Sequence, residues 1–134
     1  MLSEPEKAWL AAVIDGEGSV YLQRLYKNPK YNGGKHIRAS RMSVKVTVGN
    51  THRPFLERMR EITQREFGIG SISVNRSTWK PNRKPVYQFA ISGEKARRLL
   101  GELLPILIIK RAKAEELVQY RLLKDAERFR GGKP

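Results

Sequence analysis

Residues 41–48 alternate strictly between apolar and polar side chains. In a β-strand this alternation places the two kinds of residue on opposite faces. One face would carry only apolar side chains, and the other only polar ones: Met42, Val44, Val46 and Val48 against Arg41, Ser43, Lys45 and Thr47. A strand of this kind belongs to a sheet with one buried and one solvated face. The fold must therefore cover one face of a sheet and leave a basic face open.

The rest of the chain supplies the elements for such a sheet. Helices are predicted at 4–16, 54–67, 94–104 and 110–128, and further strands at 19–26, 70–76 and 86–92. Ser3 and Glu6 form a capping box for the first helix, and Ser92 is predicted to cap the third. The order is α-β-β-α-β-β-α with a further C-terminal helix. We expect an α+β fold with four antiparallel strands in one sheet and helices on one face.

The chain shows no internal repetition, because no segment has a second copy. Its length of 134 residues suits one domain, residues 1–134. The final stretch, 129–134, contains two glycines and a proline and is expected to form a loose tail.

Charge indicates the class of partner. The sequence has 27 Lys and Arg against 13 Asp and Glu, a net charge of +14, and these residues are spread along the whole chain. A compact domain with this charge repels itself unless a polyanion relieves the repulsion, so nucleic acid is the first candidate. A basic ribosomal or chromatin-type protein is an alternative. The absence of cysteine excludes disulfides and thiolate metal sites, and two histidines make a zinc site an unfavoured reading.

No segment predicts a membrane association. The N-terminus enters a helix at once and has no signal-peptide pattern. The most apolar run, 103–109, contains Pro105 and is too short to cross a bilayer. We expect a cytoplasmic protein, or an organellar one in a eukaryote.

The first helix carries a stripe of very small residues. Ala8, Ala12 and Gly16 are spaced by four and fall on one side of the helix. A stripe without large side chains allows the backbone of a second helix to approach closely. This pattern predicts a helix–helix contact.

The segment 10–18 reads Leu-Ala-Ala-Val-Ile-Asp-Gly-Glu-Gly. It resembles the signature of the LAGLIDADG homing endonuclease family, with Ala12 in place of Gly, Val13 in place of Leu, and Gly16-Glu17 in place of Ala-Asp. The order of elements over about residues 5–123 also resembles that family. The resemblance implies a four-stranded saddle that binds double-stranded DNA. It also implies Mg²⁺-dependent cleavage of both strands at a long, roughly palindromic site, with Mn²⁺ or Ca²⁺ able to replace Mg²⁺ in binding.

A single motif in the chain implies a homodimer, since cutting two strands takes two active sites. The expected interface comprises residues of the first helix: Ala8, Ala11, Ala12, Asp15 and Gly16. Asp15 is expected to accept hydrogen bonds from backbone amides at the dimer seam. No small-molecule cofactor and no membrane partner are expected.

Glu17 is the candidate catalytic acid. Two helices packed across a twofold axis would bring two Glu17 carboxylates together, and paired carboxylates beside a phosphate backbone hold divalent cations. Glu17 and its neighbour Gly16 are therefore the predicted metal-binding residues. The competing interpretation makes Glu17 an exposed turn residue without a role.

Two further catalytic candidates come from the resemblance. Asn50 lies where the family often has a polar residue that orders water, and Lys110 where it has a basic residue near the scissile phosphate. Asn50 could equally cap the turn into the second helix. Lys110 could be a solvated helix charge.

The solvated sheet face and its loops are the predicted DNA-binding surface. Strand residues would read base edges in the major groove, whereas loop cations would mostly grip phosphates. In the third strand, Ile72 and Val74 are expected to point inward. The candidate contacts are Ser19, Tyr21, Gln23, Lys27, Arg38, Arg41, Ser43, Lys45, Thr47, Ser73, Asn75, Arg76, Trp79, Lys80, Arg83, Lys84 and Gln88. The competing interpretation is an ordinary solvated face.

Three functions fit these observations unequally. A site-specific, intron-encoded DNA endonuclease is favoured, because Glu17 retains the acid that cleavage needs. A catalytically silent relative that binds RNA or DNA, such as an intron maturase or a regulator, has no chemical need for that acid. A basic ribosomal-type protein needs no acid at a helix end.

Overall fold

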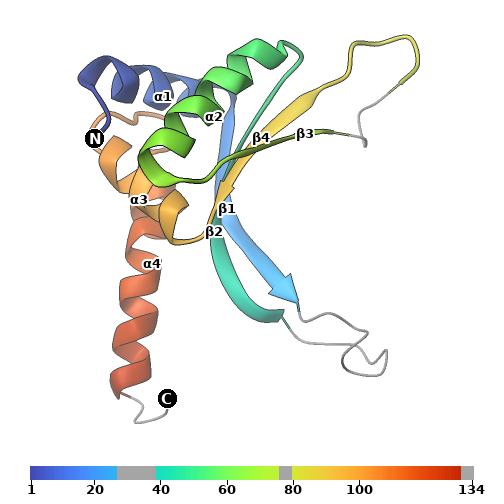
Figure 1. The fold of residues 1–134 in the computed structure, drawn as a ribbon. Helices are drawn as coiled ribbons and strands as arrows, with labels where there is room; N and C mark the ends of the chain where they lie inside the picture. Colours follow the sequence, from blue (N-terminus) through green and yellow to red (C-terminus); the bar gives the residue numbers. More distant parts are fainter. Residues whose placement is uncertain (27–38, 76–79, 131–134) are drawn as a thin grey trace, which may run out of the picture.

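The computed structural model describes residues 1–26, 39–75 and 80–130. The elements follow the predicted order (Figure 1). They are α1 Glu4–Glu17, β1 Gly18–Tyr26, β2 Ala39–Asn50, α2 Arg53–Phe67, β3 Ser71–Val74, β4 Tyr87–Ser92, α3 Glu94–Leu103 and α4 Arg111–Arg130. The predicted α+β class is confirmed, including the additional C-terminal helix.

The strands form one antiparallel sheet in the order β1-β2-β4-β3. Two hairpins, β1–β2 and β3–β4, meet along the central pair of β2 and β4. Figure 1 shows the hairpin ends diverging from this centre, while the helices lie together on one side of the sheet. The sheet is therefore covered on one face and open on the other.

The core lies between the helices and the covered face. Val46 stands at its centre, paired with Val20 on one side and Ile91 on the other. Each large apolar side chain buried here contributes about 1.5–3 kcal/mol relative to exposure. The largest fully buried side chains come from α1, α2, α3, β4 and the region around α4: Leu10, Ile14, Leu56, Met59, Ile62, Phe89, Ile91, Leu99, Leu100, Leu103, Leu107 and Leu117.

Both ends of α1 are fixed by specific residues. The predicted capping box is present, since Ser3 Oγ accepts from the Glu6 amide at 3.2 Å and the Ser3 amide donates to Glu6 Oε1 at 3.0 Å. At the other end, a Cβ on Gly18 would lie 2.8 Å from the Ile14 Cα and carbonyl oxygen. Only glycine fits this corner without a shift of backbone, and the corner sets where Glu17 stands.

Several predicted boundaries were wrong. β2 extends two residues beyond the predicted strand at each end. β3 ends at Val74, which is 42% exposed rather than inward, because this end of the hairpin runs past the helices (Figure 1). The N-cap of α3 is Gly93 at φ +81, not Ser92, and it has no side-chain cap. α4 continues to Arg130, two residues past its predicted end; residues 131–134 of the predicted tail lie outside the described ranges.

Within the described ranges, no helix combines the length and the apolar composition needed to cross a membrane.

Candidate functional site

The exposed carboxylate of Glu17 ends α1 beside the end of β2. Asn50 Nδ2 donates to Glu17 Oε2 at 3.0 Å, and Asn50 Oδ1 accepts from the His52 amide at 2.7 Å. Asn50 therefore caps the turn into α2 and holds the Glu17 carboxylate at the same time. The sequence left open whether Asn50 belongs to the site or caps the turn into the second helix, and its side chain makes a hydrogen bond of each kind.

Asp15 lies in the last turn of α1 and faces the segment that leads into α4. Its Oδ2 accepts from the Ile108 amide at 2.8 Å and its Oδ1 from the Lys110 amide at 2.9 Å. Burial works to raise the pKa of Asp15, but the backbone amides of Lys110, Ile108 and Ile109 outweigh it and the pKa lies below its ordinary value. Asp15 does accept from backbone amides, as expected, and these amides belong to its own chain.

Lys110 reaches the same end of α1. Its Nζ donates to the Asp15 carbonyl oxygen at 3.1 Å. The last carbonyls of a helix lack helical partners and carry the negative end of the helix dipole, so an ammonium group is stabilised there. Asn50 and Lys110, which stand 33 and 95 positions from their partners on α1, are thus brought to one place.

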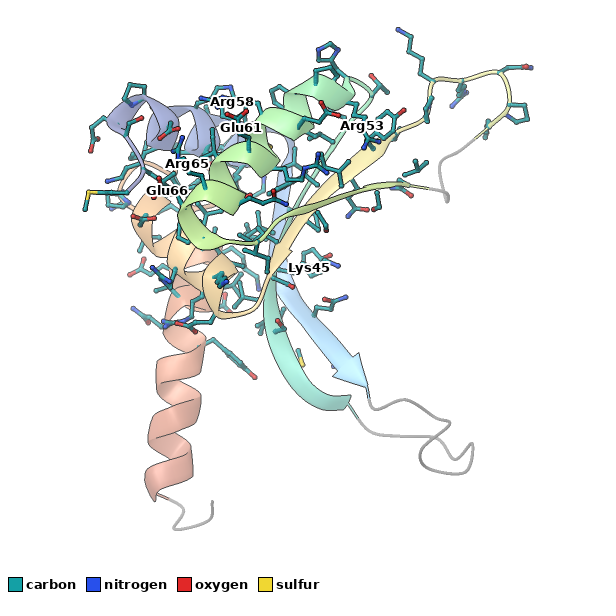
Figure 2. All side chains as sticks on the ribbon, viewed as in Figure 1. Lys45, Arg53, Arg58, Glu61, Arg65 and Glu66 are labelled. Atoms are coloured by element: carbon teal, nitrogen blue, oxygen red, sulfur yellow. The ribbon has the colours of Figure 1, made fainter. Side chains whose placement is uncertain are left out.

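The open face of the sheet carries rows of polar side chains, because the strand registers align the outward residues. One row consists of Ser19, Thr47, Ala90 and Ser71, the next of Tyr21, Lys45 and Ser92, and the hairpins add Gln23 opposite Ser43 and Ser73 opposite Gln88. Figure 2 shows Lys45 on the sheet, apart from the charged residues labelled along α2. Thr47, in the middle of its row, is only 7% exposed and offers little surface to a ligand.

The remaining predicted DNA contacts lie at the hairpin ends. The Asn75 amide donates to the Val86 carbonyl at 2.7 Å, which extends the β3–β4 pairing by one step. Lys80, Arg83 and Lys84 are exposed between these strands. The other candidates cannot be placed: Lys27, Arg38, Arg76 and Trp79 lie outside the described residues, as does the side chain of Arg41.

Solved structures similar in fold to this chain include several homing endonucleases. I-CvuI, solved with the I-CreI target and 2 mM Mg with the DNA not cleaved, aligns with a TM-score of 0.60 and 25% identity over 87% of this chain and 65% of its own. The archaeal intron-encoded I-Vdi141I, solved with DNA, aligns with a TM-score of 0.61 and 18% identity, over 94% of this chain and 73% of its own. The LAGLIDADG meganuclease I-AabMI, bound to uncleaved DNA, aligns with a TM-score of 0.59 and 19% identity, over 92% of this chain and 38% of its own. The chain has the LAGLIDADG fold.

The resemblance seen in the motif is thereby confirmed by three-dimensional structure. The motif occupies the last turns of α1, and the four-stranded open sheet follows it as the LAGLIDADG fold requires. The chain spans 65% of the length of I-CvuI. No family model and no curated protein matches the sequence.

In this LAGLIDADG fold the small-residue stripe of α1 faces outward. Ala8, Ala12 and Gly16 are exposed, and nothing lies within 4 Å of the position that a Cβ on Gly16 would take. Ala11 is 1% exposed and lies in the core of its own chain, so it does not belong to this stripe. Of the five residues predicted for the interface, Ala11 is therefore removed, and the other four remain at or near the surface.

Two features near the site were not predicted from the sequence. Ile108 and Ile109 are 83% and 73% exposed, next to the amides that Asp15 binds. The unusually apolar run 103–109, which contains both residues, was the available signal in the sequence. The second missed feature is the Arg53 guanidinium, which lies 5.2 Å from the centre of the Tyr87 ring.

Proposed function

We propose that this chain is a site-specific DNA endonuclease that cuts both strands as a homodimer by metal-dependent phosphodiester hydrolysis. The observation that carries the proposal is the meeting of Glu17, Asn50 and Lys110 at the end of α1. Gly18, which follows Glu17, pairs with Val48, so Glu17 and Asn50 share one end of the β1–β2 pair. A phosphate backbone lying along the open sheet face would pass this end.

The open face has the chemistry of a DNA-binding surface. Its rows present hydroxyl, amide and ammonium groups that can bond to base edges. The exposed cations between β3 and β4 would bind phosphates, which positions the protein without reading sequence. The net charge of +14 favours association with any polyanion. Structures of I-CvuI and I-Vdi141I with bound DNA support this assignment.

The residues at the end of α1 suit a hard divalent cation such as Mg²⁺. Oxygen donors are the ligands that Mg²⁺ prefers, and the Glu17 carboxylate with the adjacent Gly16 carbonyl would supply them. The described residues contain no group of three acidic or imidazole ligands, and the Asp15 oxygens are engaged by amides. One chain thus offers a single suitable carboxylate, and phosphate oxygens and a partner chain would complete the shell. The bound cation would polarise the phosphate and activate water.

The other residues of the site would act around this acid. Asn50 holds the Glu17 carboxylate in one orientation through a bond of 3.0 Å. Lys110 carries a positive charge at the same helix end, where it would stabilise the charge that builds on the phosphate during attack. Asp15 contributes no free oxygen to this chemistry.

The homodimer rests on the exposed surface of α1. Ala8, Ala12 and Gly16 would allow two α1 helices to approach closely across a twofold axis. Ile108 and Ile109 adjoin this stripe through the bonds to Asp15 and add apolar area. A twofold dimer would read a roughly palindromic site.

The test is cleavage of a plasmid library with random inserts, with Mg²⁺ or with EDTA. Wild type is compared with Glu17→Gln and with Glu61→Gln, which makes the same charge change on α2 (Figure 2). We expect Mg²⁺-dependent double-strand breaks at one sequence for wild type and Glu61→Gln. Glu17→Gln should bind that sequence without cutting it.

Tight, salt-sensitive binding to DNA or to a structured RNA without any cleavage would overturn the proposal. That outcome would identify a catalytically silent maturase or regulator. Cleavage that persists in Glu17→Gln would instead remove Glu17 from the active site.

A further inference from the structure

The helix α4 begins without a capping side chain of its own. Its first helical bond runs from the Ala114 amide to the Lys110 carbonyl at 2.8 Å, so Lys110 occupies the N-cap position. The residues before α4 are Ile108, Ile109 and Lys110, and none of their side chains can accept a hydrogen bond. The segment 108–110 therefore has no side chain of its own that could accept from its backbone amides.

Asp15 fixes this segment from the end of a different helix. Its two carboxylate oxygens accept from the Ile108 and Lys110 amides at 2.8 and 2.9 Å. Hydrogen bonds to an ionised acceptor are stronger than neutral ones. A negative charge at this place also complements the positive end of the α4 dipole. The carboxylate thus joins α1 to the start of α4.

The same residue holds Lys110 at both of its ends. The Asp15 carboxylate binds the Lys110 backbone amide, and the Asp15 carbonyl oxygen accepts from Lys110 Nζ at 3.1 Å. A lysine side chain has several rotatable bonds and loses conformational freedom only when both ends are fixed. The Lys110 amine is therefore held at the last turn of α1, where Asp15 precedes Glu17 by two residues.

We propose that Asp15 is a positioning residue that acts through Lys110: it anchors the segment before α4 from across the fold and holds the Lys110 ammonium at the last turn of α1, which ends at Glu17. This inference rests on the proposed function for its effect on cleavage. It assigns no metal ligand to Asp15, since both of its oxygens already bind amides. Asp15→Asn would break the arrangement, because an amide side chain presents one oxygen and must turn an NH₂ group toward the second backbone amide.

A double-mutant cycle tests the coupling. Asp15→Asn, Lys110→Met and the double variant of the full chain are compared in single-turnover cleavage of the selected site, at a temperature where circular dichroism shows each to be folded. We expect Asp15→Asn to slow cleavage by about tenfold with little change in DNA affinity. In the Lys110→Met background, the same substitution should slow it by less than about twofold. Equal effects in both backgrounds would overturn the inference.

Two measurements do not depend on cleavage. In wild type, the Ile108 and Lys110 amides should exchange slowly with deuterium although Ile108 and Ile109 are largely exposed. Asp15→Asn should speed this exchange and raise the acetylation rate of the Lys110 amine, whereas the charge-matched Glu61→Gln should change neither. Rapid exchange in wild type would refute the anchoring by Asp15 even if no variant folds. A wild type that cuts no DNA but shows these protections would refute the proposed function alone.

Discussion

Asn50 bonds Glu17 and the backbone of the next turn with the two atoms of one amide group. Its Nδ2 donates to Glu17 Oε2, and its Oδ1 accepts from the His52 amide. This arrangement makes the side chain both a turn cap and the support of the proposed catalytic acid. It also fixes which atom of the amide faces Glu17, because only the nitrogen can donate to a carboxylate.

Asn50→Asp should therefore impair cleavage more than folding. The new carboxylate keeps an acceptor for the His52 amide but replaces a donor by a like charge opposite Glu17. Losing a hydrogen bond to a charged group corresponds to about a tenfold slower reaction or more. Single-turnover rates and thermal unfolding of the same preparations would test this. An unchanged rate would place Asn50 outside the catalytic site.

Ala12→Leu should produce a stable monomer. Ala12 is exposed in the single chain, so a larger side chain meets no neighbour there, but it would hold two α1 helices apart. Sedimentation velocity would report the oligomeric state. Ala112→Leu, at an exposed alanine of α4, is the matched control and should remain dimeric. If Ala12→Leu also remained dimeric, the proposed α1 interface would be wrong.

Gly18→Ala should destabilise the fold by about 1–3 kcal/mol, because the added Cβ would lie 2.8 Å from the Ile14 backbone. Gly101→Ala is the opposite case. Gly101 is an exposed glycine inside α3 with nothing within 4 Å of its Cβ position, so alanine should stabilise by about 0.5–1 kcal/mol. Urea unfolding at equal protein concentration would measure both changes. Equal destabilisation by both substitutions would contradict the close approach at Gly18.

Glu6 makes stability depend on acid pH. The side chain of Arg65, at 2.7 Å, and the Ser3 amide lower the pKa of Glu6 from 4.5 to about 2. A carboxyl whose pKa is depressed by folding stabilises the fold above its unfolded pKa, and the stabilisation is lost as pH falls toward the folded value. Stability should drop between about pH 4.5 and 2, and Glu6→Gln should flatten this part of the profile. Parallel melting profiles of the two proteins over this range would refute the role of Glu6.

The elements were predictable because their signals are local. The alternation of 41–48, the capping box at Ser3 and Glu6, and the motif at the end of α1 are each contained in a short segment. Val74 and Ser92 were misplaced for the opposite reason. Whether Val74 is buried depends on how far the helices extend over the sheet, and the start of α3 depends on the positive φ of Gly93.

The residues of the site likewise fall into those with a signal in the sequence and those that only the fold brings together. Glu17, Asn50 and Lys110 were identified because the motif and the element order resemble a known family. The bonds from Asp15 to the segment before α4 join residues 93 and 95 positions apart, and no local pattern contains them. The exposure of Ile108 and Ile109 likewise depends on the packing of their segment in the whole fold, which no local pattern contains.

DNA affinity should fall steeply with salt, and the exposed cations between β3 and β4 should account for part of the slope. Each phosphate contact releases a counterion, so the logarithm of the binding constant falls by about 0.9 for every tenfold rise in salt per contact. Replacing Lys80, Arg83 and Lys84 together by glutamine should lower the slope by up to about three units and weaken binding to all sequences alike. Fluorescence anisotropy with a specific and an unrelated duplex over a series of KCl concentrations would measure both.

Lys45→Gln is the contrasting variant. Lys45 lies in a row on the open sheet face, where a base contact would make the loss of affinity larger for the specific duplex. If the triple variant reduced only specific binding, these three cations would be reading bases rather than holding phosphates.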